Sequence, residues 1–437
     1  MNVSTGRRRI LRGAVALAGS ASVGAPGLLR AQTQPIRIGI TNALSGPNTL
    51  YGENNLIGHR IAVSHFNKAG GLQGRQVELV VRDDRAQAAQ GVAITRELSG
   101  AGVNLLMGGG SSVVAIAICP LAQELKMVYV VNSAAAMAIT HEAWNRHVFR
   151  LCPNAYTLFM ALGRAVAETR PNLMKWGCIT PDYSFGHDAA RVFGNAVRQY
   201  HPKHASKDFE IRNTVVVAAA QSDFRPQINS LMNSDLEALF IGLLGANEIS
   251  FFQQARAVGL DKKLKLMAET AGDVAYQVLG KDMPEAIWTN VFWPYSLEPI
   301  KGVKQSQQLH QDFIALTGKQ IPNSHMYKGY HAMQGLLEGI KKAKSAETDA
   351  VINAMEDMSW ESPTGPVKIR KQDHAAVGIF FPGLFVPQPT EPYYRLKEVR
   401  PTSEVSIIET PSPGKEYVML EEERGRLRQG CFMLTEW

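Results

Sequence analysis

Short runs of β-branched and apolar residues alternate with helical patterns along most of this chain. The apolar runs span residues 36–40, 77–81, 103–107, 127–131, 176–180, 211–217, 238–243 and 265–268. Between the third and fourth runs, one face of a helix is formed by Val114, Ile118, Leu121 and Leu125. Strands and helices that alternate at this spacing predict an α/β fold with parallel sheets covered by helices on both faces.

The pattern restarts after residue 150, which indicates a second α/β unit. Inward helix faces are also predicted later in the chain, at Ala189, Phe193, Val197 and Tyr200, and at Tyr330, Met333, Leu337 and Ile340. A chain of 437 residues can hold two domains of ordinary size. We therefore expect two lobes of similar architecture.

The first 31 residues have the pattern of an export signal. Arg7, Arg8 and Arg9 precede a short, weakly apolar stretch that ends in small residues near Ala31. The arginine pair resembles a twin-arginine signal, although Gly6 stands where Ser or Thr is usual. We expect cleavage near Ala31 and a periplasmic mature protein; the alternative is a basic tail. No later apolar run reaches the about 20 residues that span a bilayer.

The net charge and the cysteine content restrict the classes of function that the chain can have. The net charge is +7, but residues 1–31 contain five arginines and no acidic residue, so the remainder carries only +2. This removes the main electrostatic support for binding nucleic acid. The four cysteines, Cys119, Cys152, Cys178 and Cys431, lie far apart. An oxidising compartment permits a disulfide, but we favour buried free thiols.

A glycine-rich turn at residues 108–112 follows one predicted strand and opens a helix. The free N–H groups and the positive dipole end of such a helix suit a carboxylate, and Ser111 and Ser112 add hydroxyl donors. The alternative is an ordinary helix cap after a tight turn. A dinucleotide fingerprint is incomplete, because Val113 stands where its last glycine would be.

Two other loops follow predicted strands. Residues 132–136 are small, so a ligand could approach their backbone amides, although a plain loop would look the same. Residues 182–186 carry Tyr183 and Phe185, which could close over a ligand; the alternative is an Asp cap with a hydrophobic staple.

Motifs for catalysis or metal binding are absent from the sequence. There is no G-x-S-x-G, H-E-x-x-H or P-loop pattern. His201 and His204 flank Pro202 and lack the third and fourth ligands of a metal set. Asp83 and Asp84 follow a strand and are interpreted as a structural pair on a turn. We therefore predict no catalytic residue, metal or cofactor.

Taken together, the motifs resemble those of ABC-transporter solute-binding proteins of the leucine/isoleucine/valine type. The resemblance covers roughly residues 35–385, and the order of the motifs is more specific than any one of them. The matching segments are Ile38-Gly39-Ile40, Leu44-Ser45-Gly46-Pro47, Tyr51-Gly52, Asn67 to Arg75, Asp83-Asp84, the Gly-Ser-Ser turn, Asp182 to Gly186 and Gln254 to Leu260.

The resemblance implies the type I periplasmic binding fold, in which two doubly wound lobes are joined by three crossing segments. Lobe one would comprise residues 33–150 plus 293–360, and lobe two residues 151–292 plus 361–400. Ligand would close the cleft between the lobes, and the closed form, expected to be a monomer, would dock on an ABC permease in the inner membrane. The resemblance does not extend to the charged, proline-containing tail at 401–437, whose role is left open.

The resemblance also implies where ligand binds. The family's binding positions correspond to Tyr51, Ser111, Ser112, Ala134, Ala136, Tyr183 and Phe185. Ala136 stands where amino-acid binders often have Thr, and Phe185 where Tyr is usual. The acid that receives an α-ammonium would be near Glu269 or Thr270, and the sequence leaves both open.

We expect aromatic walls in the cleft from Tyr51, Tyr183 and Phe185, with Trp293 as a further candidate. Together with the unassigned ammonium-binding acid, these walls favour a small carboxylate with an apolar or aromatic body as the ligand, with branched-chain amino acids and small amides as alternatives. A ligand-sensing regulator of the same fold, or an exported enzyme, remains a rival function. The regulator is disfavoured by the export signal, and the enzyme by the missing nucleophile and base motifs.

Overall fold

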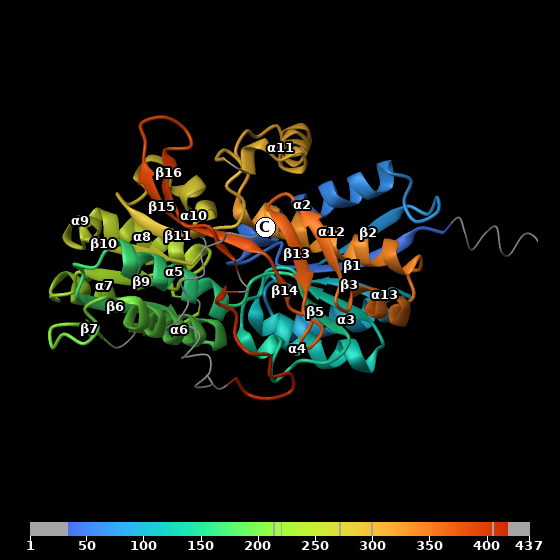
Figure 1. Ribbon diagram of the computed structural model, residues 1–437, viewed down its shortest axis with the longest axis horizontal. Helices are drawn as coiled ribbons and strands as arrows, with labels where there is room; N and C mark the ends of the chain where they lie inside the picture. The colour runs from blue at the N-terminus through green and yellow to red at the C-terminus, as the bar shows by residue number, and fades with distance from the viewer. Residues whose placement is uncertain are drawn as a thin grey trace, which may run out of the picture.

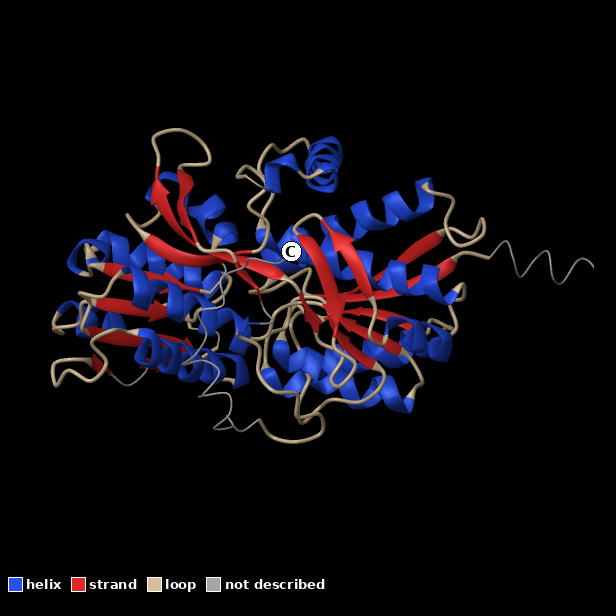
Figure 2. Ribbon diagram, in the orientation of Figure 1, coloured by secondary structure: helices blue, strands red, loops and turns tan. Residues whose placement is uncertain are grey.

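Two α/β lobes lie side by side along the length of the molecule (Figure 1). The computed structural model describes residues 34–212, 215–219, 221–270, 272–298, 300–403 and 406–417. The predicted export signal, its cleavage near Ala31 and Cys431 lie outside these residues. Each lobe has a central group of strands with helices packed around it (Figure 2).

The first lobe is built on a five-stranded parallel sheet with the order β2-β1-β3-β4-β5. Its inner strands β3 and β4 are fully buried because helices cover both faces. The elements of its first part are β1 (Ile36–Asn42), α2 (Thr49–Lys68), β2 (Val77–Asp83), α3 (Ala88–Gly100), β3 (Leu105–Gly108), α4 (Ser112–Glu124), β4 (Val128–Val131), η1 (Met137–Ile139) and β5 (Val148–Arg150).

A later stretch of chain returns to this lobe. Its helices α11 and α12 pack on α2, and its three strands form a small antiparallel sheet with the order β12-β13-β14. The elements are η3 (Ile300–Gly302), α11 (Lys304–Thr317), α12 (Ser324–Ala343), α13 (Thr348–Met355), β12 (Ser359–Ser362), β13 (Gly365–Ile369) and β14 (Ala376–Val377).

The second lobe has a mixed sheet with the order β16-β15-β11-β10-β9-β6-β7, and β8 also pairs with β6. Strands β6 to β11 are parallel, whereas β15 and β16 add an antiparallel edge. The elements are α5 (Ala155–Thr169), β6 (Lys175–Pro181), α6 (Ser184–Tyr200), β7 (Glu210–Ile211), β8 (Val215–Val217), α7 (Arg225–Met232), β9 (Ala238–Ile241), α8 (Ala246–Ala257), α9 (Leu260–Lys263), β10 (Leu266–Glu269), α10 (Asp273–Leu279), η2 (Gly280–Asp282), β11 (Ile287–Val291), β15 (Ile379–Pro387), β16 (Tyr394–Val399) and β17 (Thr402–Ser403).

The chain crosses between the lobes three times: after β5, after β11, and between β14 and β15. Residues 361–377, which the sequence assigned to the second lobe, lie beside the first lobe instead. Arg150 at the end of β5 bridges to Ala375, and its N–H donates to the His374 carbonyl (3.0 Å). The hairpin between β12 and β13 causes this difference, because it turns the chain back before it can leave the first lobe.

The helices α2 and α12 pack with their backbones in contact. A Cβ atom added to Gly58 would lie 2.1 Å from the Met326 carbonyl oxygen, and one added to Gly329 would lie 2.1 Å from the Asn55 carbonyl oxygen. Only glycine fits such an approach. The contact holds the first turns of α12 close against α2, at the edge of the lobe that faces the cleft.

The described part of the tail, residues 406–417, contacts both lobes. The buried Glu409 carboxylate lies 3.8 Å from the Arg150 guanidinium, and the Asn154 side-chain amide at the start of α5 donates to it. The Tyr417 ring packs near the rings of His141 and Tyr156, at 5.2 and 5.6 Å. The tail therefore joins the lobes near the first crossing. Its charged segment at 421–428 lies outside the described residues.

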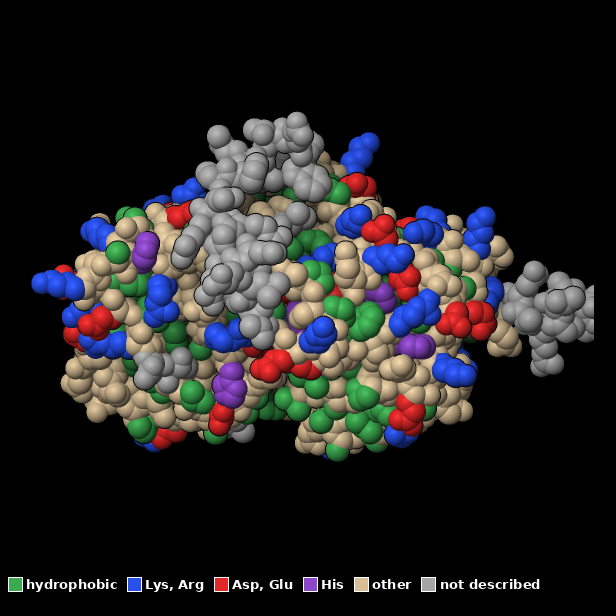
Figure 3. Space-filling model, turned by 60° about the horizontal axis from the view of Figure 1, so that its bottom comes forward, with side chains coloured by type: hydrophobic (Ala, Val, Ile, Leu, Met, Phe, Trp, Pro, Cys, Tyr) green, Lys and Arg blue, Asp and Glu red, His purple; other side chains and the backbone are tan. Residues whose placement is uncertain are grey.

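The molecular surface carries charges of both signs. Lysine and arginine side chains are interspersed with acidic ones over the face in Figure 3, in keeping with the small net charge beyond residue 31. Among the described residues, no helix combines the length and apolar character needed to cross a membrane. Cys119, Cys152 and Cys178 are buried, and none of them forms a disulfide with another described residue.

Candidate ligand-binding site between the lobes

A cavity lies between the two lobes, at the carboxyl ends of β3, β4, β6, β9 and β10. It is partly open to solvent. Open α/β sheets present their ligands at these strand ends. The lining residues are Asn48, Tyr51, Gly110, Ser111, Ser112, Ser133, Ala134, Ala135, Leu158, Tyr183, Phe185, Leu244, Thr270, His325 and Lys328.

The glycine-rich turn directs the start of α4 toward this cavity. Ser111 is the N-cap residue, and its side chain makes no capping hydrogen bond. The Ser112 hydroxyl oxygen accepts a hydrogen bond from the Ala136 N–H (3.3 Å). Ala136 therefore supports Ser112 from behind and does not line the cavity, whereas Ala134 does. Backbone N–H groups at the helix start are suited to an anionic ligand group.

Tyr51 on α2 connects the lobes across the cavity. Its side chain is buried, its hydroxyl donates to Glu248 Oε2 (3.1 Å), and the same hydroxyl accepts from the Gly245 N–H (2.7 Å). The Tyr51 ring also lies edge-on to the His325 ring, with 4.0 Å between centroids. Because Gly245 and Glu248 belong to the second lobe, this contact holds the lobes together on one side of the cavity.

Aromatic side chains from the second lobe form the opposite wall. The rings of Tyr183 and Phe185 lie 6.1 Å apart, and Phe185 packs against Phe159 on α5 (5.9 Å). Thr270 follows β10, and its hydroxyl donates to the Ile241 carbonyl (3.4 Å). The cavity thus combines apolar walls with a few polar groups, a composition typical of small-molecule sites.

Glu269 does not line the cavity, whereas its neighbour Thr270 does. Glu269 Oε1 accepts hydrogen bonds from the Gly272 N–H (2.7 Å) and the Tyr276 hydroxyl (3.2 Å). Burial raises the pKa of the adjacent Glu248, and the Glu269 charge raises it further. Both carboxyl groups are fully buried, and among the described residues Glu248 Oε1 has no hydrogen-bond partner.

Three polar residues of the cavity were not predicted from the sequence: Asn48, which precedes α2, and the pair His325 and Lys328. The last two are on α12 and are 4% and 7% exposed. Burial lowers the pKa of Lys328 to about 8, against the raising effect of Cys152 and Asp273. The available signal was a lysine within the aromatic sequence Met326–Tyr330, which is unusual in a buried helix.

The comparisons with known proteins agree with this geometry. The model of a family described as periplasmic binding protein matches residues 35–381. A leucine-, isoleucine-, valine-, threonine- and alanine-binding protein of Pseudomonas aeruginosa is 25% identical over 366 residues, which cover 84% of this chain and 92% of the relative.

Solved structures of solute-binding proteins of ABC transporters have the same fold. One from Rhodopseudomonas palustris BisB5, in complex with 3,4-dihydroxybenzoic acid, superposes with a TM-score of 0.74 at 22% identity and covers 86% of this chain and 99% of its own. Another from R. palustris, in complex with benzoate, gives a TM-score of 0.74 at 19% identity and covers 88% and 100%. The predicted fold, including two lobes joined by three crossing segments, is confirmed. The chain therefore belongs to the periplasmic binding protein family.

Proposed function

We propose that this protein is an extracytoplasmic receptor that binds one small carboxylate with an apolar or aromatic body and delivers it to an ABC permease in the inner membrane. The observation that carries the proposal is the cavity between the lobes, with Tyr51 on one wall and Tyr183 and Phe185 on the other. Flat or apolar bodies bind well against aromatic faces. The start of α4, with Ser111 and Ser112, offers N–H and hydroxyl donors for a carboxylate.

The environment of the acidic residues favours this ligand class over α-amino acids. An α-ammonium needs an acceptor that faces the cavity, whereas the Glu269 carboxylate is engaged by Gly272 and Tyr276. Two kinds of ligand are named among similar proteins: branched-chain and other small amino acids in the P. aeruginosa relative, and benzoates in the R. palustris structures. The aromatic side chains of Tyr51, Tyr183 and Phe185 support the second kind for this chain.

Export supports the transport role. The arginine-rich start of the sequence is typical of a signal that would place the receptor in the periplasm, with cleavage near Ala31. Closure of the lobes around ligand would create the surface that the permease recognises. In this role the ligand is released unchanged.

Calorimetry with leucine, valine, short-chain amides and substituted benzoates tests the ligand class. We expect one site that binds a benzoate or a branched short-chain acid, and we expect the ligand to be recovered unaltered. Tight leucine binding that disappears in Glu269→Gln would restore the amino-acid alternative. Chemically altered ligand would favour an enzyme.

A further inference from the structure

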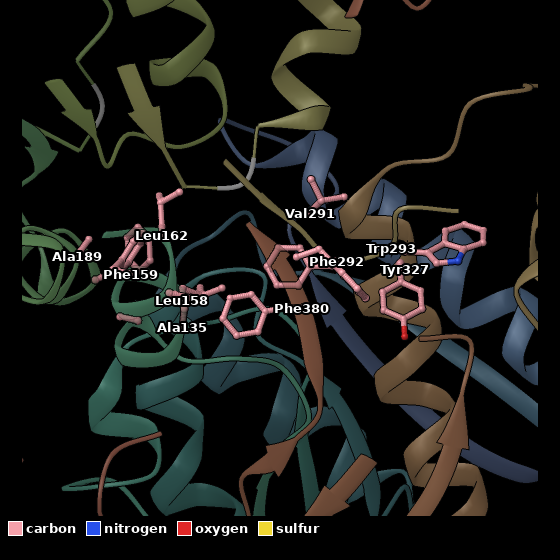
Figure 4. Close-up of a cluster of buried hydrophobic side chains, with 14 of the residues drawn as sticks. Ala135, Leu158, Phe159, Leu162, Ala189, Val291, Phe292, Trp293, Tyr327 and Phe380 are labelled. Carbon is pink, nitrogen blue, oxygen red and sulfur yellow. The ribbon is translucent and has the colours of Figure 1, made fainter. Parts of the chain in front are cut away.

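Lys328 separates the cleft cavity from a second one, which we call the hinge-side cavity. The hinge-side cavity is partly open to solvent and is lined by residues of all three crossing segments: 151–153, Phe292 and 378–380. Lys328 lines both cavities. The close-up in Figure 4 shows aromatic side chains of this region, among them Phe292 and Phe380. The lysine therefore stands at the inner end of the cleft.

The ammonium group of Lys328 forms no close ion pair among the described residues, although the charges of Cys152, Asp273 and Glu269 act on it from farther away. Its Nζ lies 3.9 Å above the centroid of the Phe292 ring, and it forms no ion pair or hydrogen bond with any residue that the structure describes. The nearby Asp273 carboxylate accepts from both the N–H and the hydroxyl of Ser324 instead (2.7 and 2.8 Å). A charge that is only 7% exposed and unpaired is costly, because a single aromatic face replaces little of its hydration.

A second unpartnered group lies one turn away. His325 Nδ1 is buried without a hydrogen-bond partner among the described residues. Residues 325 and 328 are three positions apart on α12, so their side chains lie on the same face of the helix, and both line the cleft cavity. The Lys328 ammonium can only donate, so an acceptor group bound in the cleft would give it a partner, whereas His325 Nδ1 would donate to that group in only one of its tautomers.

From this arrangement we propose that the Lys328 ammonium binds the carboxylate of the ligand and makes the receptor select acids over amides of the same shape. This inference rests on the proposed function, because it assigns a residue to the acid-binding role of the same cleft. A bound carboxylate supplies the missing counter-charge through a charge-assisted hydrogen bond. A neutral amide leaves the buried ammonium unpaired and is rejected for that reason.

Matched acids and amides test the proposal: 4-hydroxybenzoate with 4-hydroxybenzamide, 3-methylbutanoate with 3-methylbutanamide, and leucine with leucinamide. Calorimetry compares the wild-type protein with Lys328→Met and with the control Lys341→Met, an exposed lysine on the same helix. We expect Lys328→Met to weaken acid binding by about thirtyfold or more and to bring acid and amide to similar affinity. Lys341→Met should behave as the wild type.

The melting temperature of the free protein provides a second readout. Lys328→Met should leave the melting temperature unchanged or raise it, because it removes an unpaired buried charge. If Lys328 had a purely structural role, the same substitution would lower the melting temperature. If Lys328→Met retains the wild-type preference for an acid, the Lys328 assignment is wrong but the proposed function stands. A wild-type protein that binds none of the acids, or binds the amides equally well, overturns both.

Discussion

Replacing Glu409 with Gln should destabilise the protein strongly, because its buried carboxylate lies close to two arginine guanidinium groups and a histidine ring. It is 3.7 Å from the Arg370 guanidinium, 3.8 Å from that of Arg150 and 3.5 Å from His141 Nε2. Burial opposes ionisation of Glu409, but the His141 contact and the two arginine charges outweigh burial and lower its pKa to about 2. The group is therefore ionised in the folded protein at neutral pH.

The size of the effect follows from this pKa. A glutamate with a folded pKa of about 2 and an ordinary value of 4.5 contributes about 3 kcal/mol to the free energy of unfolding. Because the folded pKa is the lower one, the contribution is complete above pH 4.5 and is lost as pH falls toward 2. About 2 kcal/mol of it should be gone at pH 3.

Urea unfolding of wild type and Glu409→Gln at pH 7 and pH 3 measures this contribution. The difference in unfolding free energy should be about 3 kcal/mol at pH 7 and smaller by about 2 kcal/mol at pH 3. Glu398→Gln is the matched control, because Glu398 is in a half-exposed pair with Arg170 and should cost no more than about 1 kcal/mol. If Glu409→Gln lowers the unfolding free energy by less than about 1 kcal/mol, or by an amount that does not depend on pH, the reasoning is refuted.

Three further changes have defined outcomes. Ser112→Ala should weaken binding of the preferred acid about tenfold in calorimetry, because a hydroxyl near the ligand is lost; an unchanged affinity would leave only backbone amides or Ser111 in that role. Gly329→Ala should lower the unfolding free energy by about 2 kcal/mol or more, because the added Cβ would lie 2.1 Å from a carbonyl oxygen of α2. Gly194→Ala is the control and should not lower the unfolding free energy, because its added Cβ would have its nearest contact at 3.6 Å. Replacing Arg7 and Arg8 with lysine should leave the precursor in the cytoplasmic fraction of the cells. Normal export of this double variant would exclude the twin-arginine route.

The sequence predicted the lobes well because their signal is local. Most apolar runs become buried strands, while β2 is half-buried beyond Val77, and the helices between the strands follow directly from the spacing of their apolar residues. The run at 211–217 is the exception, since it contains two short strands, β7 and β8. Loops that follow parallel strands meet at one edge of each sheet, so the turn at 108–112 and the segment at 182–186 both reach the cavity.

Contacts between distant segments could not be predicted in the same way. Lys328 enters the cavity only because glycines on α2 and α12 let the two helices touch, and those glycines are 271 positions apart in the sequence. Glu269 is next to a cavity residue, but its side chain is engaged by Gly272 and Tyr276. The charge cluster around Glu409 likewise depends on a tail that the family resemblance does not cover.

A crystal structure of the protein saturated with the acid that binds tightest in calorimetry tests the central claim most directly. We expect one ligand in the cavity between the lobes, in contact with Tyr51 and Ser112 on one side and Phe185 on the other. Its carboxylate should lie within hydrogen-bonding distance of Lys328 Nζ. A ligand bound outside the cleft, with the cavity between the lobes empty, would contradict the account.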